Sequence, residues 1–383
     1  RHTMSSIEKT EDISTAATDE HAVPLPTMLV NIQFLRFAAA MLVVFYHSSA
    51  HLRSTGLDQG FLYDIFEAIG FAGVDVFFVI SGFIMAYTTT KDQGLGDAIG
   101  FFKRRVALIY SGYWPFYLLA IAVFTWVGGN YLTDVAFWNS LILWPGGKPL
   151  IAVSWTLIYE MFFYIMFTLL IIFTTSKRNL LLLLLFLGIV SWSIYSHFVR
   201  HAYDEGHLVF MSLSEAYMAS PYLAEFLGGS LLAGWLSRNQ TGQSWSWLLA
   251  GILLFLAGGW VNNSFFDGQI EQGYFVFWRV LVFGSASLLM LAGLVRLELA
   301  GKLTPLKFSL AAGGASYAIY LSHILWLTAT QYLGLNDFLG QFSSWVAQLV
   351  FLAYAVLILY YCIAHYRIIE RPLHRLFKKG LGV

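Results

Sequence analysis

Apolar residues occur along this chain in long runs that are separated by short polar segments. A helix needs roughly 20 mostly apolar residues to cross the hydrocarbon core of a bilayer. Ten runs of this kind are present, of which the sixth and seventh are short and rich in glycine. The runs are 29–48, 69–90, 107–128, 151–174, 179–197, 222–236, 246–262, 274–295, 309–333 and 344–366. The pattern predicts an all-α polytopic membrane protein with about ten transmembrane helices.

The two ends of the chain differ from this pattern. Residues 1–27 are polar, acidic and rich in serine and threonine, so they offer almost nothing to bury and are predicted to form a disordered tail. The first three residues, which precede Met4, are interpreted as a remnant of an expression tag. Residues 28–366 are assigned to one transmembrane domain, and residues 367–383 to a basic C-terminal segment.

Composition excludes several classes of protein. Charged residues make up 11% of the chain, against about 25% in an ordinary soluble domain, while 58% are hydrophobic. Lysine plus arginine and aspartate plus glutamate number 22 each, so there is no overall basic field to hold nucleic acid. The single cysteine, Cys362, excludes a disulfide framework. His197, His201 and His207 could together form a metal site. The loop that contains them has no convincing third ligand at regular spacing, so these residues are interpreted as part of a solvated loop and no metal is expected.

The lysines and arginines indicate how the chain is oriented. With ten spans and a cytoplasmic N-terminus, 17 of these 22 residues lie in inner segments, 3 in outer segments and 2 within spans. This is the bias that the positive-inside rule describes. A missed or spurious span would exchange the sides of every later segment, so the bias also supports the count. We therefore expect both termini in the cytoplasm.

Ionisable side chains at membrane depth are costly, so each is a functional candidate. Arg36 and His47 share the first span and are eleven residues apart. Eleven steps of 100° complete three turns and about 20°, so both side chains point the same way and lie about 16–17 Å apart along the axis. In the simplest alternative, His47 is interfacial and Arg36 snorkels. Arg36 is too deep for comfortable snorkelling, so the pair favours a polar cavity with His47 near its outer end.

Four further ionisable residues lie in other spans. Glu160 is surrounded by aromatic residues and needs a partner, for which Arg279 is the obvious cation. A structural Glu160–Arg279 pair and a catalytic role for either residue both stay open. Asp75, at the outer end of the second span, either orients a histidine or caps a helix. His323 has a depth comparable to that of His47, but a lone membrane histidine is often simply hydrogen-bonded to a neighbour.

A basic cluster, Lys103-Arg104-Arg105, immediately precedes the third span on the cytoplasmic side. Such clusters fix topology and contact anionic lipid. They can also clamp the phosphates of a nucleotide-bearing donor. The cluster alone does not decide between these two interpretations.

Several of these residues fall within motifs of a known family. Arg36 and His47 form an Arg-x10-His pattern. The other matching stretches are Gly73-Val74-Asp75-Val76-Phe77-Phe78-Val79-Ile80-Ser81-Gly82-Phe83, Trp155-Thr156-Leu157-Ile158-Tyr159-Glu160, Ala315-Ser316-Tyr317-Ala318-Ile319-Tyr320-Leu321-Ser322-His323 and Ile369-Glu370-Arg371-Pro372. They span nearly the whole chain in the expected order. The chain resembles the membrane-bound acyltransferase-3 family, and within it the branch that modifies exopolysaccharides.

The resemblance implies a reaction and its partners. It implies transfer of an acyl group, usually acetyl, from cytoplasmic acyl-CoA to a hydroxyl of an exopolysaccharide or its lipid-linked precursor at the outer face. It also implies a bacterial inner membrane as the location, with membrane lipid around the chain and polysaccharide assembly machinery as a partner.

The resemblance also implies roles for individual residues. His47 would take a proton from the sugar hydroxyl or become acylated itself. Arg36 would hold the donor, and Asp75 or Glu160 would fix the histidine tautomer. Lys103, Arg104 and Arg105 would bind the phosphates of acetyl-CoA. The expected substrate-binding or supporting residues are His323, Arg279 and Tyr159.

Two positions depart from the family pattern, which usually reads Arg-Arg-x-x-Arg-Ile-x-Pro at the basic cluster. Leu108 stands in place of the third arginine, and Ser111 in place of the proline. Arg104 and Arg105 are retained. The expected third basic contact to the donor is therefore missing from this segment.

Three other interpretations compete with an acyltransferase of this family. The chain could be a transporter or flippase for a lipid-linked glycan, a scaffold for polysaccharide assembly, or a membrane-bound O-acyltransferase of an unrelated type with a deep Asn and His pair. The halves of the chain cannot be matched as inverted repeats, which argues against a secondary transporter. The Arg-x10-His spacing together with a cytoplasmic basic cluster favours the acyltransferase of the resembled family.

Overall fold

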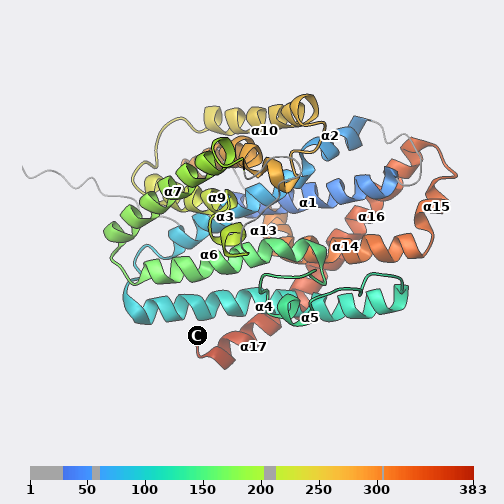
Figure 1. Ribbon diagram of the computed structural model, residues 1–383, viewed down its shortest axis with the longest axis horizontal. Helices are drawn as coiled ribbons and strands as arrows, with labels where there is room; N and C mark the ends of the chain where they lie inside the picture. The colour runs from blue at the N-terminus through green and yellow to red at the C-terminus, as the bar shows by residue number, and fades with distance from the viewer. Residues whose placement is uncertain (1–28, 54–60, 202–212, 304–305) are drawn as a thin grey trace, which may run out of the picture.

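The computed structural model describes residues 29–53, 61–201, 213–303 and 306–383 (Figure 1). Within these ranges the chain is almost entirely helical, and its sole β-type pairing is an isolated bridge between Val135 and Lys148. The predicted all-α fold is confirmed. The predicted disordered tail, residues 1–27, lies outside the described residues.

Each of the ten predicted apolar runs coincides with one helix or with consecutive helices. These are α1 (Val30–Arg53), α2 (Phe61–Ile69) with α3 (Gly73–Thr88), α4 (Gly94–Val127), α6 (Trp155–Ile171), α7 (Thr175–Phe198), α9 (Tyr222–Leu236), α10 (Trp245–Phe265), α11 (Val276–Arg279) with α12 (Ser285–Leu299), α13 (Lys307–Gly314) with α14 (Ser316–Tyr332), and α16 (Ser344–His365). The remaining α-helices are α5 (Phe137–Leu141), α8 (Leu213–Met218), α15 (Leu335–Leu339) and α17 (Arg371–Leu381). Two π-helical segments, Val280–Gly284 and Tyr366–Glu370, interrupt the eighth and follow the tenth run.

Length and composition decide which of these helices can cross a membrane. Eight segments of the described chain qualify, and a ninth is obtained if α13 and α14, which meet at 55°, form one bent span. The predicted sixth span is α9, which has 15 residues and is therefore only about 22 Å long. That is shorter than the hydrocarbon core of about 30 Å. The protein is a multi-pass membrane protein, and the cytoplasmic placement of its termini stays a prediction.

Glycine allows the short helix α9 to lie directly against α3. A Cβ atom on Gly82 would lie 1.9 Å from the Phe226 carbonyl oxygen, and one on Gly229 would lie 2.1 Å from the Val79 carbonyl oxygen. Ser230 Oγ donates a hydrogen bond to the Gly82 carbonyl at 2.9 Å. Small residues permit this close backbone approach between membrane helices. Helix α9 is thus held inside the bundle by α3.

Replacing Gly82 with alanine is expected to destabilise the protein, because the methyl group can be accommodated only if α3 and α9 separate. Overpacking of this kind costs about 1–3 kcal/mol. Thermal unfolding of the protein in lipid nanodiscs measures the effect. Gly188→Ala is the matched control, since a Cβ on Gly188 in α7 meets nothing within 4 Å. Equal melting temperatures for the two variants would contradict the packing described here.

Helix α1 lies at the centre of the bundle and contacts α3, α12, α13 and α14 (Figure 1). Its first backbone N–H groups are satisfied by the Glu298 carboxylate near the end of α12. Val30 N donates to Glu298 Oε1 at 2.6 Å, and Asn31 N donates to Glu298 Oε2 at 2.8 Å. A carboxylate at this position also interacts favourably with the positive end of the helix dipole. The start of α1, two turns before Arg36, is therefore fixed to α12.

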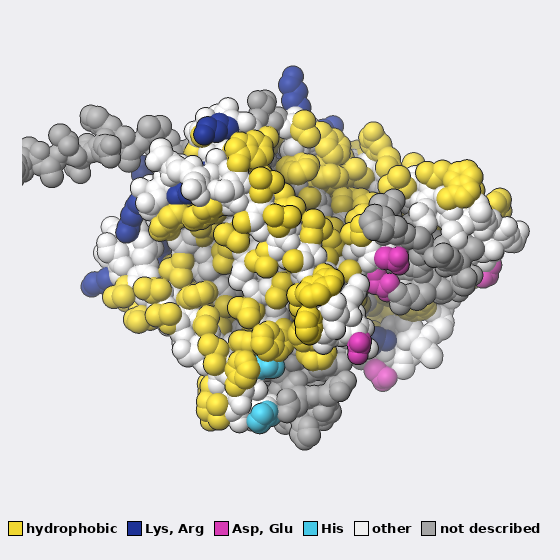
Figure 2. Space-filling model, turned by 90° about the horizontal axis from the view of Figure 1, so that it is seen from above, with side chains coloured by type: hydrophobic (Ala, Val, Ile, Leu, Met, Phe, Trp, Pro, Cys, Tyr) yellow, Lys and Arg dark blue, Asp and Glu magenta, His cyan; other side chains and the backbone are white. Residues whose placement is uncertain are grey.

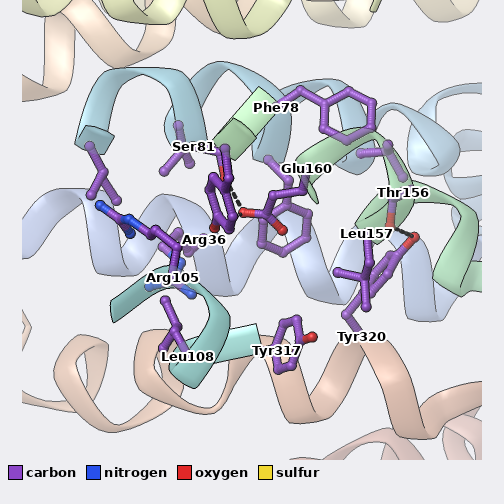
Figure 3. A pocket seen from close by; sticks show the side chains of 15 residues that line it. Arg36, Phe78, Ser81, Arg105, Leu108, Thr156, Leu157, Glu160, Tyr317 and Tyr320 are labelled. Atoms are coloured by element: carbon purple, nitrogen blue, oxygen red, sulfur yellow. Dashed lines mark hydrogen bonds between the residues drawn. The ribbon is translucent and has the colours of Figure 1, made fainter. Parts of the chain in front are cut away.

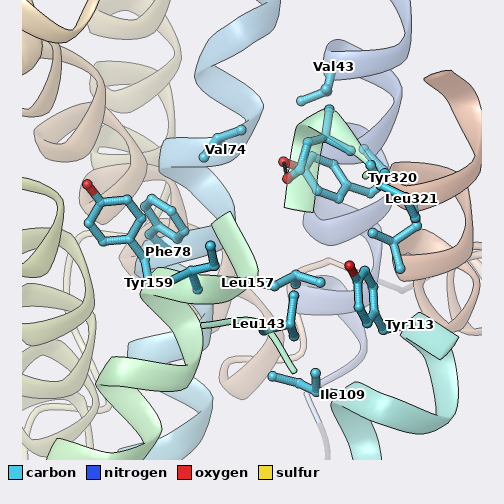
Figure 4. Close-up of a cluster of buried hydrophobic side chains, with 14 of the residues drawn as sticks. Val43, Val74, Phe78, Ile109, Tyr113, Leu143, Leu157, Tyr159, Tyr320 and Leu321 are labelled. Atoms are coloured by element: carbon cyan, nitrogen blue, oxygen red, sulfur yellow. Dashed lines mark hydrogen bonds between the residues drawn. The ribbon is translucent and has the colours of Figure 1, made fainter. Parts of the chain in front are cut away.

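Apolar side chains cover much of the surface between the two ends of the long axis (Figure 2). In that view the basic side chains lie towards the left and along the upper edge, and the acidic ones lie to the right. The largest buried cluster joins α1, α3, α4, α6 and α14, with Val43, Val74, Tyr113, Leu157 and Leu321 among its members (Figure 4). This core surrounds the polar groups described next.

Candidate active site

A cavity of about 130 Å³ lies within the bundle, between α1, α3, α4, α6 and α14 (Figure 3). Its polar lining consists of Arg36, Ser81, Arg105, Glu160 and Tyr164 together with hydroxyl groups of α6 and α14. The rest of the wall is aliphatic and aromatic. Arg36 therefore does line a polar cavity, as the sequence predicted for this position.

The Glu160 carboxylate is the acidic centre of this cavity. Ser81 Oγ donates a hydrogen bond to Glu160 Oε1 at 2.7 Å, and the Tyr164 hydroxyl donates to the same oxygen at 2.5 Å. Tyr164 lies one turn after Glu160 on α6, whereas Ser81 comes from α3. Hydrogen bonds to a charged group are stronger than those between neutral groups. The carboxylate is thus held in place facing the α1 side of the cavity, from which Arg36 projects.

A second cavity, of about 480 Å³, adjoins the first. Both are lined by Arg36, Leu108, Glu160, Tyr164 and Tyr317, so these residues form the shared wall. The second cavity extends towards the C-terminal segment, where it is lined by Lys307, Arg367, Glu370 and Arg371. It therefore provides a mainly cationic approach to Arg36 and Glu160.

Two histidines lie beyond the opposite end of the central cavity. Tyr320 lines that end, and its ring centroid is 6.0 Å from that of His323. The His323 ring lies 5.1 Å from the His47 ring, at an interplanar angle of 33°. His323 is fully buried, whereas His47 is half-buried. Neither histidine lines the cavity, so the expectation that Arg36 and His47 share one polar cavity is wrong for His47: Tyr320 lies between the Arg36 region and the histidine pair.

Tyr320 is held firmly in this position. Its hydroxyl donates to the Val153 carbonyl at 3.0 Å and accepts a hydrogen bond from Thr156 Oγ1 at 3.0 Å. Phe77 packs against the same ring with centroids 5.8 Å apart. Arg36, Tyr320, His323 and His47 thus follow one another along the inner side of α1 and α14.

The family model described as an acyltransferase domain matches residues 29–367. The chain belongs to the acyltransferase-3 family. It is also 27% identical over 318 residues to the exopolysaccharide production protein ExoZ of Rhizobium meliloti (strain 1021), a match that covers 80% of this chain and 90% of ExoZ. No solved structure matches the chain. The protein is accordingly a membrane acyltransferase of the acyltransferase-3 family.

Arg279 pairs with Asp75 in this acyltransferase, so the predicted pairing of Arg279 with Glu160 is wrong. Arg279 Nε donates to both Asp75 oxygens at 3.1 and 3.0 Å, and Nη2 donates to Asp75 Oδ2 at 2.7 Å. Nη2 also donates to the Phe71 carbonyl at 3.2 Å, and the guanidinium lies over the Phe71 ring. Both side chains are at most 4% exposed. Since Arg279 binds both Asp75 oxygens, Asp75 is positioned as a structural partner and not as a group that orients a histidine.

Sequence reasoning missed Glu225, which is buried to 1% exposure on α9. It lies next to the Asp75–Arg279 pair and interacts electrostatically with both residues. Its Oε1 packs against Gly284, where a Cβ would lie only 2.8 Å away. The sequence does contain a feature that could have identified Glu225, because it is an acidic residue within an apolar run. That run, 222–236, is the shortest of the ten, which made its depth in the membrane hard to judge.

The basic cluster is divided between different environments. Arg105 lines the central cavity, with its guanidinium over the Phe101 and Tyr164 rings. Arg104 faces outward and forms a 3.5 Å ion pair with Asp92. Lys103 is not among the residues that line these cavities. The three basic side chains thus do not act as one clamp on the central cavity.

The two departures from the family pattern are both on α4. Leu108 is 40% exposed and lines the central cavity as well as the second one. Ser111 is buried, and its hydroxyl donates to the Leu108 carbonyl at 3.2 Å. An apolar side chain therefore stands where the two cavities meet.

Two remaining candidates lie away from this region. Tyr159 projects from α6 towards α8 and donates a hydrogen bond to the Ala216 carbonyl at 2.9 Å, outside the central cavity. His197 packs its ring on Phe277 with centroids 4.9 Å apart. His207 lies outside the described residues. Within the described ranges, no three His, Cys, Asp or Glu side chains gather closely enough to hold a metal ion.

Proposed function

We propose that this protein is an O-acetyltransferase of the bacterial inner membrane. It moves an acetyl group from cytoplasmic acetyl-CoA to a hydroxyl of an exopolysaccharide, or of its lipid-linked precursor, at the outer face. Membership of the acyltransferase-3 family supports the reaction class. The similarity to ExoZ, a protein of exopolysaccharide production, supports the acceptor class.

One observation carries the proposal: a cationic approach, a polar cavity and a histidine pair follow one another along α1 and α14. Lys307, Arg367 and Arg371 line the approach, and Arg36 and Glu160 line the inner cavity. Phosphates bind well to arginine and lysine, because hydrogen bonds between charged groups are short and strong. The unbranched, amide-containing arm of the donor suits the inner cavity, where Arg36 donates hydrogen bonds and Glu160 accepts them.

His47 performs the proton transfer in this proposal. Its imidazole takes the proton of the acceptor hydroxyl, whose oxygen attacks the thioester carbonyl carbon. The C–S bond then breaks, and the departing CoA sulfur takes the proton from the imidazolium. In the alternative route, a His47 nitrogen attacks the thioester carbonyl carbon, the C–S bond breaks and CoA leaves as the thiol with the ring proton. The acceptor oxygen then attacks the acetyl-imidazole, the C–N bond breaks, and the released imidazole takes the hydroxyl proton. His323, at a ring separation of 5.1 Å, is placed to select the His47 nitrogen that stays free for either route.

The surroundings of the protein follow from the same proposal. The apolar surface is in contact with membrane lipid, and the acceptor approaches His47 from the outer side. A lipid-linked acceptor would be delivered by the machinery that assembles the polysaccharide, which makes that machinery a proposed partner.

Mass spectrometry of the surface polysaccharide tests the proposal. Cells that produce the protein are expected to carry an acetyl ester on one sugar of the repeat unit, and cells that lack the protein are not. Restoring the intact chain should restore the ester. An identical acetyl content in the presence and absence of the protein would reject acetyl transfer to this acceptor.

A further inference from the structure

A third cavity, of about 260 Å³, lies beside the central one, between the end of α3, the first part of α4 and the C-terminal helix α17. Helix α17 packs along α4 and is joined to α16 by a π-helical segment. The polar residues that line this cavity are Thr88, Thr89, Arg104, Arg105, His374 and Lys378. Two of the basic groups therefore come from α4 and two from α17.

This cavity differs from the second one in its charge. None of its lining residues is acidic, whereas Glu160 and Glu370 both line the second cavity. Asp92 pairs with Arg104 at 3.5 Å but does not line the cavity. Cations that converge on one space repel one another, and a bound anion removes that repulsion. The lining is therefore suited to an anionic group with several oxygens.

Two of the four basic side chains, Arg105 and His374, contact neighbouring hydroxyl groups. Arg105 Nη2 donates to Thr88 Oγ1 at 3.4 Å, while the Thr88 hydroxyl itself donates to the Ile84 carbonyl at 2.8 Å. His374 Nδ1 lies 3.5 Å from Ser111 Oγ. Lys378 is one turn after His374 on the same side of α17, and it is half-buried. Arg105 and His374 thus need little further ordering to bind a ligand.

The third cavity also connects with the central one. Arg105 and Leu108 line both of them. A ligand with an anionic end in the third cavity can thus extend past Leu108 towards Arg36 and Glu160. Leu108 supplies no charge at this junction, so the cation that supplements Arg104 and Arg105 is Lys378 of α17, and His374 adds a ring nitrogen for hydrogen bonding.

From this arrangement, and resting on the donor assigned above, we propose that α17 completes the donor site: His374 and Lys378, together with Arg104 and Arg105, bind a phosphate group of the nucleotide end of acetyl-CoA. The C-terminal helix is then part of the substrate-binding machinery. Lys103, which does not line the cavity, has no part in it.

Two neighbouring lysines provide a matched test. Lys378 lines the cavity, whereas Lys379 is exposed on the same helix and does not. The full chain is placed in nanodiscs of phosphatidylcholine, and its dissociation constant for acetyl-CoA is measured for the parent, Lys378→Ala and Lys379→Ala. We expect the constant to rise about tenfold for Lys378→Ala and less than about twofold for Lys379→Ala. Lys378→Arg should keep the parent affinity, and unchanged melting temperatures show that all variants are folded.

Two shortened donors identify the phosphate. If the 3′-phosphate is bound, the penalty of Lys378→Ala disappears with 3′-dephospho-acetyl-CoA. If the diphosphate is bound, the penalty persists with that donor and disappears with acetyl-pantetheine. Either result supports the proposal.

Other outcomes would overturn it. Equal affinities of Lys378→Ala and Lys379→Ala, with a parent protein that binds acetyl-CoA, would reject the role of α17 and leave the proposed function intact. A difference that appears only when anionic phosphatidylglycerol is added would assign the cavity to a lipid headgroup instead. A parent protein that does not bind acetyl-CoA at all would reject the donor, and with it both proposals.

Discussion

Replacing His47 with alanine is expected to lower the rate of acetyl transfer by about 10²–10⁴-fold, the usual contribution of a positioned general base. The position of His47 supports this role in addition to the chemistry of its imidazole. His47 is the half-buried member of the histidine pair, and it lies on the same helix as Arg36, beyond Tyr320. Transfer of labelled acetyl groups from acetyl-CoA by membrane preparations measures the effect.

His201→Ala is the matched control for this experiment, because His201 is an exposed histidine outside the cavities. It should transfer acetyl groups at the parent rate. The dissociation constant of His47→Ala for acetyl-CoA should stay within about twofold of the parent value, since the donor is held by Arg36 and the basic residues. Unaltered turnover in His47→Ala would remove His47 from the chemistry.

Asp75→Asn is expected to destabilise the protein by about 3–5 kcal/mol, the typical cost of breaking a buried ion pair. Asp75 accepts three hydrogen bonds from Arg279, and both residues are almost inaccessible to solvent. The substitution leaves the Arg279 guanidinium buried without its ionic partner. Thermal unfolding in nanodiscs measures the loss.

Removing both charges should be tolerated better than removing one. We expect the double variant Asp75→Leu, Arg279→Met to be more stable than Asp75→Asn, because the buried guanidinium is removed together with its main partner. Glu225 is the other acid that interacts electrostatically with Arg279, so Glu225→Gln combined with Asp75→Asn should cost more than the sum of the two single substitutions. Additive losses would show that Glu225 does not compensate for Asp75.

The helices of this fold could be predicted from the sequence because a bilayer imposes one strong requirement on it. Every backbone polar group must be satisfied inside the membrane, so a long apolar run becomes a helix whatever its neighbours are. Arg36 could be assigned to a cavity for the same reason, since a guanidinium at that depth needs polar surroundings. The prediction of the helices and that of the cavity at Arg36 each require only one segment of the sequence and the fact that a bilayer surrounds it.

The partners of the buried charges could not be predicted in this way. Asp75 and Arg279 are 204 residues apart, and nothing in the sequence favours that pair over Glu160 and Arg279. The choice follows from which helices touch: α3 contacts the π-helical segment after Arg279, while α6 presents Glu160 to Ser81. The position of α17 beside α4 likewise depends on which helices pack together, so it could not be predicted from either segment alone.

The fixed ring of Tyr320 has a consequence for the cell as a whole. A protein that admits a charged metabolite halfway into the membrane could also let protons leak across it, which would dissipate the proton gradient. Here the cavity reached past the basic residues is bordered by an aromatic ring whose hydroxyl is hydrogen-bonded to the Val153 carbonyl. A barrier at Tyr320 that opens only for the donor arm would let the acyltransferase bind its donor from one side while the membrane stays electrically insulating.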